Sequence, residues 1–241
     1  MKYFSLFSGV AGGDLAFQHL LEGFRCVGYV EIEEYPRKVI KQRIKDGLLD
    51  AAPIFTDIKQ FVSEGYAEAY KGMVDLVTGG FPCQDISCAG KGAGIEGERS
   101  GLWSEMAEVV RQVRPKYVFV ENSPMLTIRG LGTVLGDLAK MGFNARWGCI
   151  SAADVGAVHK RNRIWIVSYS ECGRARGVWK REVVGQNKRE VGNERYRKLA
   201  TVFGRFNDVA YWMDRKRAIG NGQVPQCAAT AWRILSGMVE T

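Results

Sequence analysis

The chain has 241 residues, of which 46% are hydrophobic and 25% charged, and it carries a formal net charge of +8 at pH 7. This length suits one α/β domain with a small insertion, and the positive charge favours a polyanionic partner. No apolar run approaches the roughly 20 residues of a membrane span, so a membrane protein is excluded.

Apolar runs alternate with stretches of helical character, in the order typical of a mostly parallel sheet. Strands are expected at Tyr3–Phe7, Cys26–Glu31, Ile54–Phe55, Leu76–Thr78, Tyr117–Glu121, Phe143–Ser151 and Ile164–Tyr169. Helices are expected at Asp14–Leu21, Tyr35–Asp46, Leu102–Val113, Val134–Met141 and Val224–Ser236. The pattern loosens after Ser170 and resumes near Ala218. The expected organisation is therefore a sheet domain over 1–170, an insert over 171–214 and a return to the sheet domain over 215–241.

The first expected strand runs into the loop Phe7-Ser8-Gly9-Val10-Ala11-Gly12-Gly13. Such a loop lets the backbone approach a ligand at the carboxyl end of the sheet. Glu31 ends the second strand, where it is placed to accept both hydrogen bonds from a ribose diol. Asp57 and Ile58, after the third strand, are placed to read an adenine edge. Each feature alone also fits an ordinary turn or a surface charge, but together they favour a nucleoside site.

The chain has no G-x-x-x-x-G-K-[ST] loop, which disfavours nucleoside triphosphate chemistry. An adenosine-bearing cofactor without phosphates, S-adenosylmethionine, fits this glycine loop.

Cys83 lies in Gly79-Gly80-Phe81-Pro82-Cys83-Gln84-Asp85-Ile86-Ser87, directly after an apolar run. A cysteine packed as a small hydrophobe would normally sit inside the strand, so this position favours a reactive thiol over an inert loop residue. The six cysteines are dispersed without a C-x-x-C pair, and His19 and His159 are the only histidines. We therefore expect no metal site and no disulfide framework.

Glu121 and Asn122 end the apolar strand that contains Val118. If this strand lies beside the one that precedes Cys83, the carboxylate is a neighbour of the thiol. Desolvation would raise the pKa of Glu121 and let it donate a proton at neutral pH. A structural carboxylate that caps the next helix is the alternative interpretation.

The insert is basic, with ten Lys or Arg against six acids between Glu171 and Asp214, followed by Arg215-Lys216-Arg217. A solvated, partly disordered insertion is one interpretation. Interleaved aromatic residues argue against plain disorder, because such segments usually lack them.

Together these motifs resemble the DNA (cytosine-5)-methyltransferases, over nearly the whole chain and in that family's order. Further motifs that carry the resemblance are Gly101-Leu102-Trp103, His159-Lys160-Arg161-Asn162-Arg163 and Gly220-Asn221-Gly222-Gln223-Val224-Pro225. The resemblance implies a Rossmann-like α/β fold that is S-adenosylmethionine-dependent. It has a mostly parallel seven-stranded sheet with helices on both faces, plus a small basic recognition insert.

The resemblance also implies the reaction, a methyl transfer from S-adenosylmethionine to carbon 5 of cytosine in DNA. Cys83 would add to carbon 6 of a flipped-out base, and Glu121 would protonate ring N3. Arg161 and Arg163 would bind the base's carbonyl and a flanking phosphate. The implied cofactor contacts are Phe7, Ser8, Gly9, Val10, Gly12, Gly13, Glu31, Ile32, Asp57, Ile58, Gly80, Pro82, Leu102, Asn221 and Gln223. The implied substrate contacts are Gln84, Ser87, Arg99 and Asn122.

The chain departs from the family pattern in three places. Ala11 stands where many relatives have glycine, and the run from His159 to Arg163 replaces the more usual Gln-Arg-Arg-Glu-Arg. The recognition region before Gly220 has only about fifty residues, which predicts a short or weakly specific target site.

The predicted partner is double-stranded DNA, with a cognate restriction endonuclease as a second candidate. The expected protein is a monomer in the cytoplasm of a prokaryotic host, or is phage-encoded. An RNA (tRNA) cytosine-5 methyltransferase and a catalytically silent DNA-binding regulator are the alternative functions.

Overall fold

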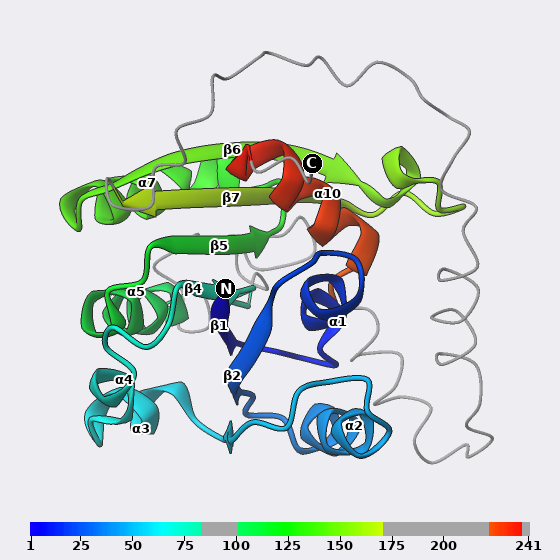
Figure 1. Cartoon of the computed structure of the whole chain (residues 1–241). Coiled ribbons are helices and arrows are strands. Elements are labelled where there is room, and N and C mark those ends of the chain that lie inside the picture. The colour runs from blue at the N-terminus through cyan, green and yellow to red at the C-terminus, as the bar shows by residue number, and fades with distance from the viewer. Residues whose placement is uncertain (83–100, 171–221, 238–241) are drawn as a thin grey trace.

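A seven-stranded sheet with helices on both faces forms the described part of the computed structural model, which comprises residues 1–82, 101–170 and 222–237 (Figure 1). The spatial order of the strands is β3-β2-β1-β4-β5-β7-β6. The strands are β1 (Lys2–Leu6), β2 (Arg25–Val30), β3 (Ile54–Phe55), β4 (Leu76–Gly79), β5 (Tyr117–Asn122), β6 (Phe143–Ser151) and β7 (Asn162–Ser170). The predicted fold class is confirmed.

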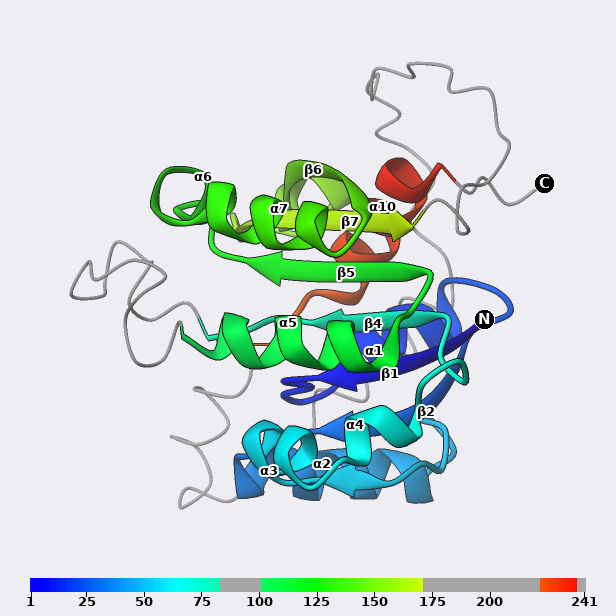
Figure 2. The ribbon, with the colours of Figure 1, turned by 90° about the vertical axis from the view of Figure 1, so that its left-hand side faces the viewer.

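The first five strands of the sheet are parallel, and β7 is antiparallel to both β5 and β6. Figure 2 shows the arrowheads of β1, β4 and β5 pointing to the same side of the molecule, with β7 opposed. Gly79 of β4 pairs with Leu6 of β1 and with Val120 of β5. The loops that follow these three strands therefore leave the sheet at one edge.

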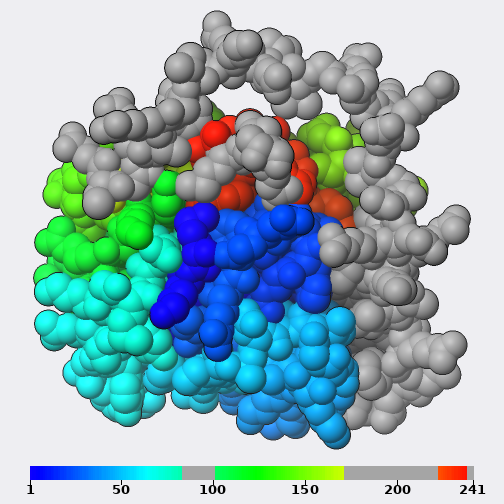
Figure 3. Space-filling model, in the orientation of Figure 1, coloured from blue at the N-terminus to red at the C-terminus, as the bar shows by residue number. Residues whose placement is uncertain are grey.

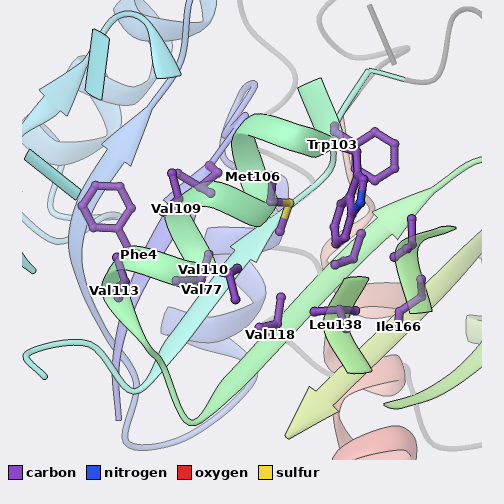
Figure 4. Packing of buried hydrophobic residues seen from close by; sticks show 14 of the residues in the cluster. Phe4, Val77, Trp103, Met106, Val109, Val110, Val113, Val118, Leu138 and Ile166 are labelled. Carbon is purple, nitrogen blue, oxygen red and sulfur yellow. The ribbon is translucent and has the colours of Figure 1, made fainter. Parts of the chain in front are cut away.

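Helices cover both faces of the sheet, because their apolar residues repeat at helical spacing. The helices are α1 (Gly12–His19), α2 (Glu34–Lys45), α3 (Ile58–Ser63), α4 (Tyr66–Ala69), α5 (Leu102–Val113), α6 (Leu126–Arg129), α7 (Leu131–Lys140), the 3-10 helix η2 (Ala152–Val155) and α10 (Pro225–Ser236). In Figure 4, Met106, Val109 and Val110 of α5 lie against Val77 of β4 and Val118 of β5. A second core on the opposite face joins α1, α2 and α10 to the sheet.

The expected element boundaries agree with the structure to within one or two residues for most elements. Leu102–Val113 and Phe143–Ser151 match fully. Helix α7 begins at Leu131, three residues before the expected start, because Gly130 ends α6 and opens α7. The short helices α3, α4 and α6 were not expected, since runs of four to six residues carry little helical periodicity.

Helix α10 brings the C-terminal part of the described chain back onto its beginning. Pro225 occupies its first turn, where the missing N–H costs nothing. Arg233 Nη2 donates a hydrogen bond of 2.5 Å to the carbonyl of Leu20, just past α1. In the space-filling view, α10 (red) lies against the N-terminal segment (blue) (Figure 3). The segment 222–224 is thereby placed over the loop that follows β1.

Within the described ranges, no helix has the length and apolar character needed to cross a bilayer. The same ranges contain no cluster of His, Cys, Asp and Glu side chains suited to a metal ion.

Candidate active site

The glycine loop after β1 adopts an unusual backbone conformation. Phe7 and Ala11 have φ values of 51° and 58°, in the left-handed region that non-glycine residues rarely adopt. Ser8 N–H donates to the carbonyl of Val30 at 3.1 Å, which ties the loop to the end of β2. From α2, the buried Arg43 donates through Nη1 to the carbonyl of Val10. The loop is thus held by two neighbouring elements.

Glu31 lies one residue past β2 and is only 6% exposed. Its Oε2 accepts from Gly9 N–H at 2.6 Å, and its Oε1 accepts from Glu33 N–H at 2.8 Å. Burial raises the pKa of Glu31, and these two backbone hydrogen bonds oppose that rise. Each carboxylate oxygen keeps a second lone pair, as a ribose diol would need. Ile32 beside it is 66% exposed, an apolar side chain offered to solvent at the same edge.

A small pocket opens beside the loop and contains a buried carboxylate. Its lining residues are Ser5, Leu6, Phe7, Ser8, Gly13, Asp14, Thr78, Gly79 and Gln223. Asp14 Oδ2 accepts from Ser5 Oγ at 3.1 Å, whereas Oδ1 has no hydrogen-bond partner among the described residues. Burial raises the pKa of Asp14 to about 6. A buried acceptor without a partner, in a polar pocket, fits the cationic amino-acid end of S-adenosylmethionine.

The remaining predicted cofactor contacts on this side lie at the same edge but have structural roles of their own. Asp57 caps α3, with Oδ1 accepting from Lys59 N–H at 2.8 Å. The side chain of Ile58 is buried in the core, so a ligand would meet only its backbone. Leu102 opens α5 and packs partly against the same core. Their contacts with a cofactor stay predictions.

The loop that leads to Cys83 starts beside β5. Asn122 Nδ2 donates to the carbonyl of Phe81 at 3.1 Å, and Asn122 Oδ1 accepts from Ser123 N–H at 2.8 Å. These bonds tether Phe81 and the neighbouring Pro82 to β5, and they occupy the amide for which we predicted a base contact. Cys83, Gln84, Ser87, Arg99 and Asn221 lie outside the described residues.

The three cysteines in the described ranges are poor candidates for a nucleophile. Cys26 and Cys227 are buried, and burial raises the pKa of Cys26 well above its usual value and that of Cys227 to about 11. Cys149 is more exposed, but its pKa is also raised by desolvation. A thiolate, rather than a thiol, is the attacking form. None of these three is therefore suited to nucleophilic attack at neutral pH.

Glu121 lies near the end of β5 and is 7% exposed. Its Oε1 forms an ion pair of 2.8 Å with Arg163 Nε from the neighbouring strand β7. Burial raises the pKa of Glu121 above its usual value, and the charges of Arg163 and Arg161 oppose that rise. We made the nearness of Glu121 to the loop of Cys83 conditional on adjacent strands, and β4 does pair with β5.

Arg161 and Gln223 complete the surroundings of this carboxylate. Arg161 Nη2 donates to the carbonyl of Gly222 at 2.7 Å. Gln223 donates a side-chain hydrogen bond to Glu121. The predicted arginine pair therefore borders Glu121, with Arg163 in direct contact, while binding of a base and a phosphate by the two arginines stays a prediction.

Sequence reasoning missed three features of this site, namely Asp14, Arg43 and the contact between Gln223 and Glu121. An acid directly after a glycine loop is a weak signal, because it also suits the first turn of a helix. Arg43 lies three residues after Ile40 and seven after Pro36, on the buried face of α2, but an arginine is a residue type that is usually exposed. The Gln223 contact joins positions about a hundred residues apart, so only the fold brings them together.

Comparisons with known proteins point to one family. The family model described as C-5 cytosine-specific DNA methylase matches residues 1–221. The Type II methyltransferase M.CviJI of Paramecium bursaria Chlorella virus IL3A is 34% identical over 160 residues, which cover 66% of this chain and 40% of that protein. M.Sau3AI of Staphylococcus aureus is 29% identical over 187 residues, covering 71% of this chain and 44% of that protein. The chain thus spans less than half the length of these two relatives.

Solved structures show the same fold at low sequence identity. The S. pombe Dnmt2 methyltransferase superposes with a TM-score of 0.56 at 18% identity, covering 74% of this chain and 51% of that one. The DNMT2 of Spodoptera frugiperda gives a TM-score of 0.56 at 18% identity, with 70% and 50% covered.

Proposed function

Because the chain belongs to the C-5 cytosine-specific DNA methylase family, we propose that it transfers a methyl group from S-adenosylmethionine to carbon 5 of cytosine in DNA. One observation carries this proposal. Strands β1, β4 and β5 are adjacent and parallel, with Leu6, Gly79 and Val120 in register. The glycine loop and the loop that leads to Cys83 therefore leave the sheet at the same edge. The buried Glu121 lies near the end of β5 at that edge.

The chain's own residues suit the methyl donor at this edge. Glu31 binds the ribose hydroxyls through its remaining lone pairs, and Ile32 packs on the adenine ring. Asp14, whose Oδ1 has no partner among the described residues, faces the ammonium group. The bound donor supplies a methyl group on a sulfonium, which cytosine carbon 5 can attack once the ring is activated.

Activation of the ring falls to Cys83 and Glu121. The Cys83 thiolate adds to carbon 6, and Glu121 gives its proton to ring N3, so that no full negative charge develops on the ring. The raised pKa of Glu121 supports this role, because the carboxyl keeps its proton closer to neutral pH than an exposed glutamate does. After methylation, water takes the carbon-5 proton and the thiolate leaves carbon 6. Ring N3 returns its proton to Glu121, which restores the free enzyme.

The remaining parts of the proposal concern partners and context. Residues 171–214 form the target-recognition insert between the catalytic domain, 1–170, and the C-terminal return, 215–241. Phosphate contacts from its ten Lys and Arg residues offset the few kcal/mol that base flipping costs. The protein acts as a monomer in the cytoplasm of a prokaryotic host, or is phage-encoded, and a restriction endonuclease of the same target site is its candidate partner.

Bisulfite sequencing of DNA from a host that expresses the chain tests the proposal directly. We expect 5-methylcytosine in one sequence context with the wild type and none with Cys83→Ser. Methyl transfer from tritiated donor to purified tRNA, with none to duplex DNA, would instead establish the RNA-directed alternative. A covalent complex on 5-fluorocytosine duplex, lost in Cys83→Ser, would exclude a catalytically silent regulator.

A further inference from the structure

Gln223 occupies a narrow site between two glycine loops. A methyl group built on Gly13 would lie 2.1 Å from Gln223 Oε1, and one built on Gly12 would lie 2.1 Å from its backbone carbonyl oxygen. On the other side, a methyl group built on Gly80 would lie 3.1 Å from Gln223 Nε2. Gly13 and Gly80 therefore leave the space that the side chain fills, and Gly12 leaves space for the backbone carbonyl of Gln223.

The amide end of Gln223 meets the carboxylate of Glu121. A methyl group on Gly80 would also lie 2.7 Å from Glu121 Oε2, so this oxygen and Gln223 Nε2 border the same glycine. Glu121 has a side-chain hydrogen bond with Gln223, and because a carboxylate oxygen can only accept, the amide donates. The ion pair of Arg163 is made by the other oxygen, Oε1. Glu121 is thus held from two sides by two different donors.

A hydrogen bond to the preceding residue also helps to place Gln223. Arg161 Nη2 donates to the carbonyl of Gly222, the preceding residue, at 2.7 Å. Gln223 also lines the small pocket that contains Asp14 and Ser8. One side chain therefore forms a wall of the proposed donor pocket and contacts the proposed proton donor.

We propose that Gln223 is a positioning residue, which fixes the Glu121 carboxylate and links its placement to the wall of the donor pocket. The donor part of this inference rests on the proposed function, whereas the Glu121 part rests only on the contacts just described. A glutamate at this position would set a second carboxylate beside Glu121. Asparagine would be one methylene too short to reach.

Titration of Glu121 in the full chain, without donor or DNA, tests the positioning role. The probe is carbon-13 NMR of protein labelled at the glutamate carboxyl carbons, with Glu121→Gln assigning the signal. In Gln223→Met, which keeps the length but cannot donate, we expect the midpoint to rise by about one pH unit, since the hydrogen bond favours the charged form. Gln42→Met is the matched control, because Gln42 donates to Asp46 at 2.8 Å on the exposed surface of α2. Its Glu121 midpoint should match the wild type.

An unchanged Glu121 midpoint in Gln223→Met would overturn the positioning role. Gln223→Asn serves as a second variant if the methionine variant does not fold, and the same upward shift is expected there.

Calorimetry with S-adenosylhomocysteine tests the donor wall, with an expected loss of affinity of about three- to tenfold in Gln223→Met. Unchanged affinity would refute that part. If the wild type transfers no methyl group while Gln223→Met still raises the Glu121 midpoint, the proposed function is refuted and the positioning role stands.

Discussion

At the scale of single residues, the site places ionisable groups where water cannot solvate them. Glu121, Glu31 and Asp14 are each less than a tenth exposed, and the pKa of each is raised by burial. Their partners differ, however. Glu121 faces arginine, Glu31 accepts backbone N–H groups, and Asp14 accepts a hydroxyl hydrogen bond on one oxygen. Burial is therefore the main cause of each raised pKa, and these partners oppose the rise.

Replacement of Arg163 should lower the free energy of unfolding, because it leaves the buried Glu121 without its ion-pair partner. Arg163→Met removes the partner of a pair whose side chains are 24% and 9% exposed, so we expect a loss of about 1–3 kcal/mol in the free energy of unfolding. Because the folded-state pKa of Glu121 is raised, and rises further without Arg163, the carboxyl is protonated at low pH and the loss is small there. The loss grows as the pH rises through the folded-state pKa of Glu121 in the wild type, where the carboxyl that pairs with Arg163 becomes charged.

Urea unfolding at several pH values between about 5 and 8 measures this effect. The double variant Glu121→Gln/Arg163→Met is the control, and its stability difference from Glu121→Gln should not vary with pH. A loss in Arg163→Met that is equal at all pH values would contradict the prediction.

Ionisation of the Asp14 carboxyl should lower the free energy of unfolding as the pH rises. Its folded-state pKa of about 6 lies above the usual 3.8, so the native state binds more protons between these values. The stability contributed by the neutral form is complete below about pH 4 and lost by about pH 6, a difference of about 3 kcal/mol for two pKa units. Asp14→Asn cannot ionise. We expect the difference in free energy of unfolding between Asp14→Asn and the wild type to rise by up to that amount across this pH range. A difference that does not change with pH would contradict the raised pKa of Asp14.

At the scale of elements, the close approach of α1 to the segment before α10 depends on Gly12. Gly12→Ala would set its Cβ atom 2.1 Å from a backbone oxygen of Gln223, which no rotamer change can relieve. We expect unfolding by urea to show a loss of about 1–3 kcal/mol, together with weaker binding of S-adenosylhomocysteine.

Gly136→Ala is the matched control for that change. Gly136 lies inside α7, and a methyl group there would have no atom within 4 Å. This substitution should raise the free energy of unfolding by about 0.5–1 kcal/mol, because alanine favours the helix. A Gly12→Ala variant as stable as the wild type would contradict the close contact.

Elements with a long apolar period could be predicted from the sequence, and contacts between distant loops could not. The helix Leu102–Val113 and the strand Phe143–Ser151 have strong local signals and match the structure. The sequence placed Glu121 near the loop of Cys83 only on the condition that their two strands are adjacent, and the pairing of β4 with β5 meets that condition. By contrast, the partners of Gln223 and the burial of Asp14 depend on how α10 and α1 pack. No local spacing encodes that packing.

At the scale of the whole molecule, we propose one catalytic sheet joined to a short basic insert. The three loops at the carboxyl edge supply the proposed chemistry, and residues 171–214 supply ten of the chain's 34 Lys and Arg residues. Arginine and lysine contacts with phosphate bind DNA without reading its sequence, so in the proposed insert most of the charge would add affinity rather than specificity.

If the insert reads the target as proposed, its length limits the size of the target site. Each specified base pair needs side chains at its edge, and a zinc finger of about 30 residues reads about three base pairs. We expect the insert to specify a site of fewer than about five base pairs. Bisulfite sequencing of a plasmid propagated with the chain measures this through the bases that flank each methylated cytosine, with Cys83→Ser as the blank. Strict methylation confined to one site of about five base pairs or more would refute the expectation, because the insert would then read more bases than its length supports.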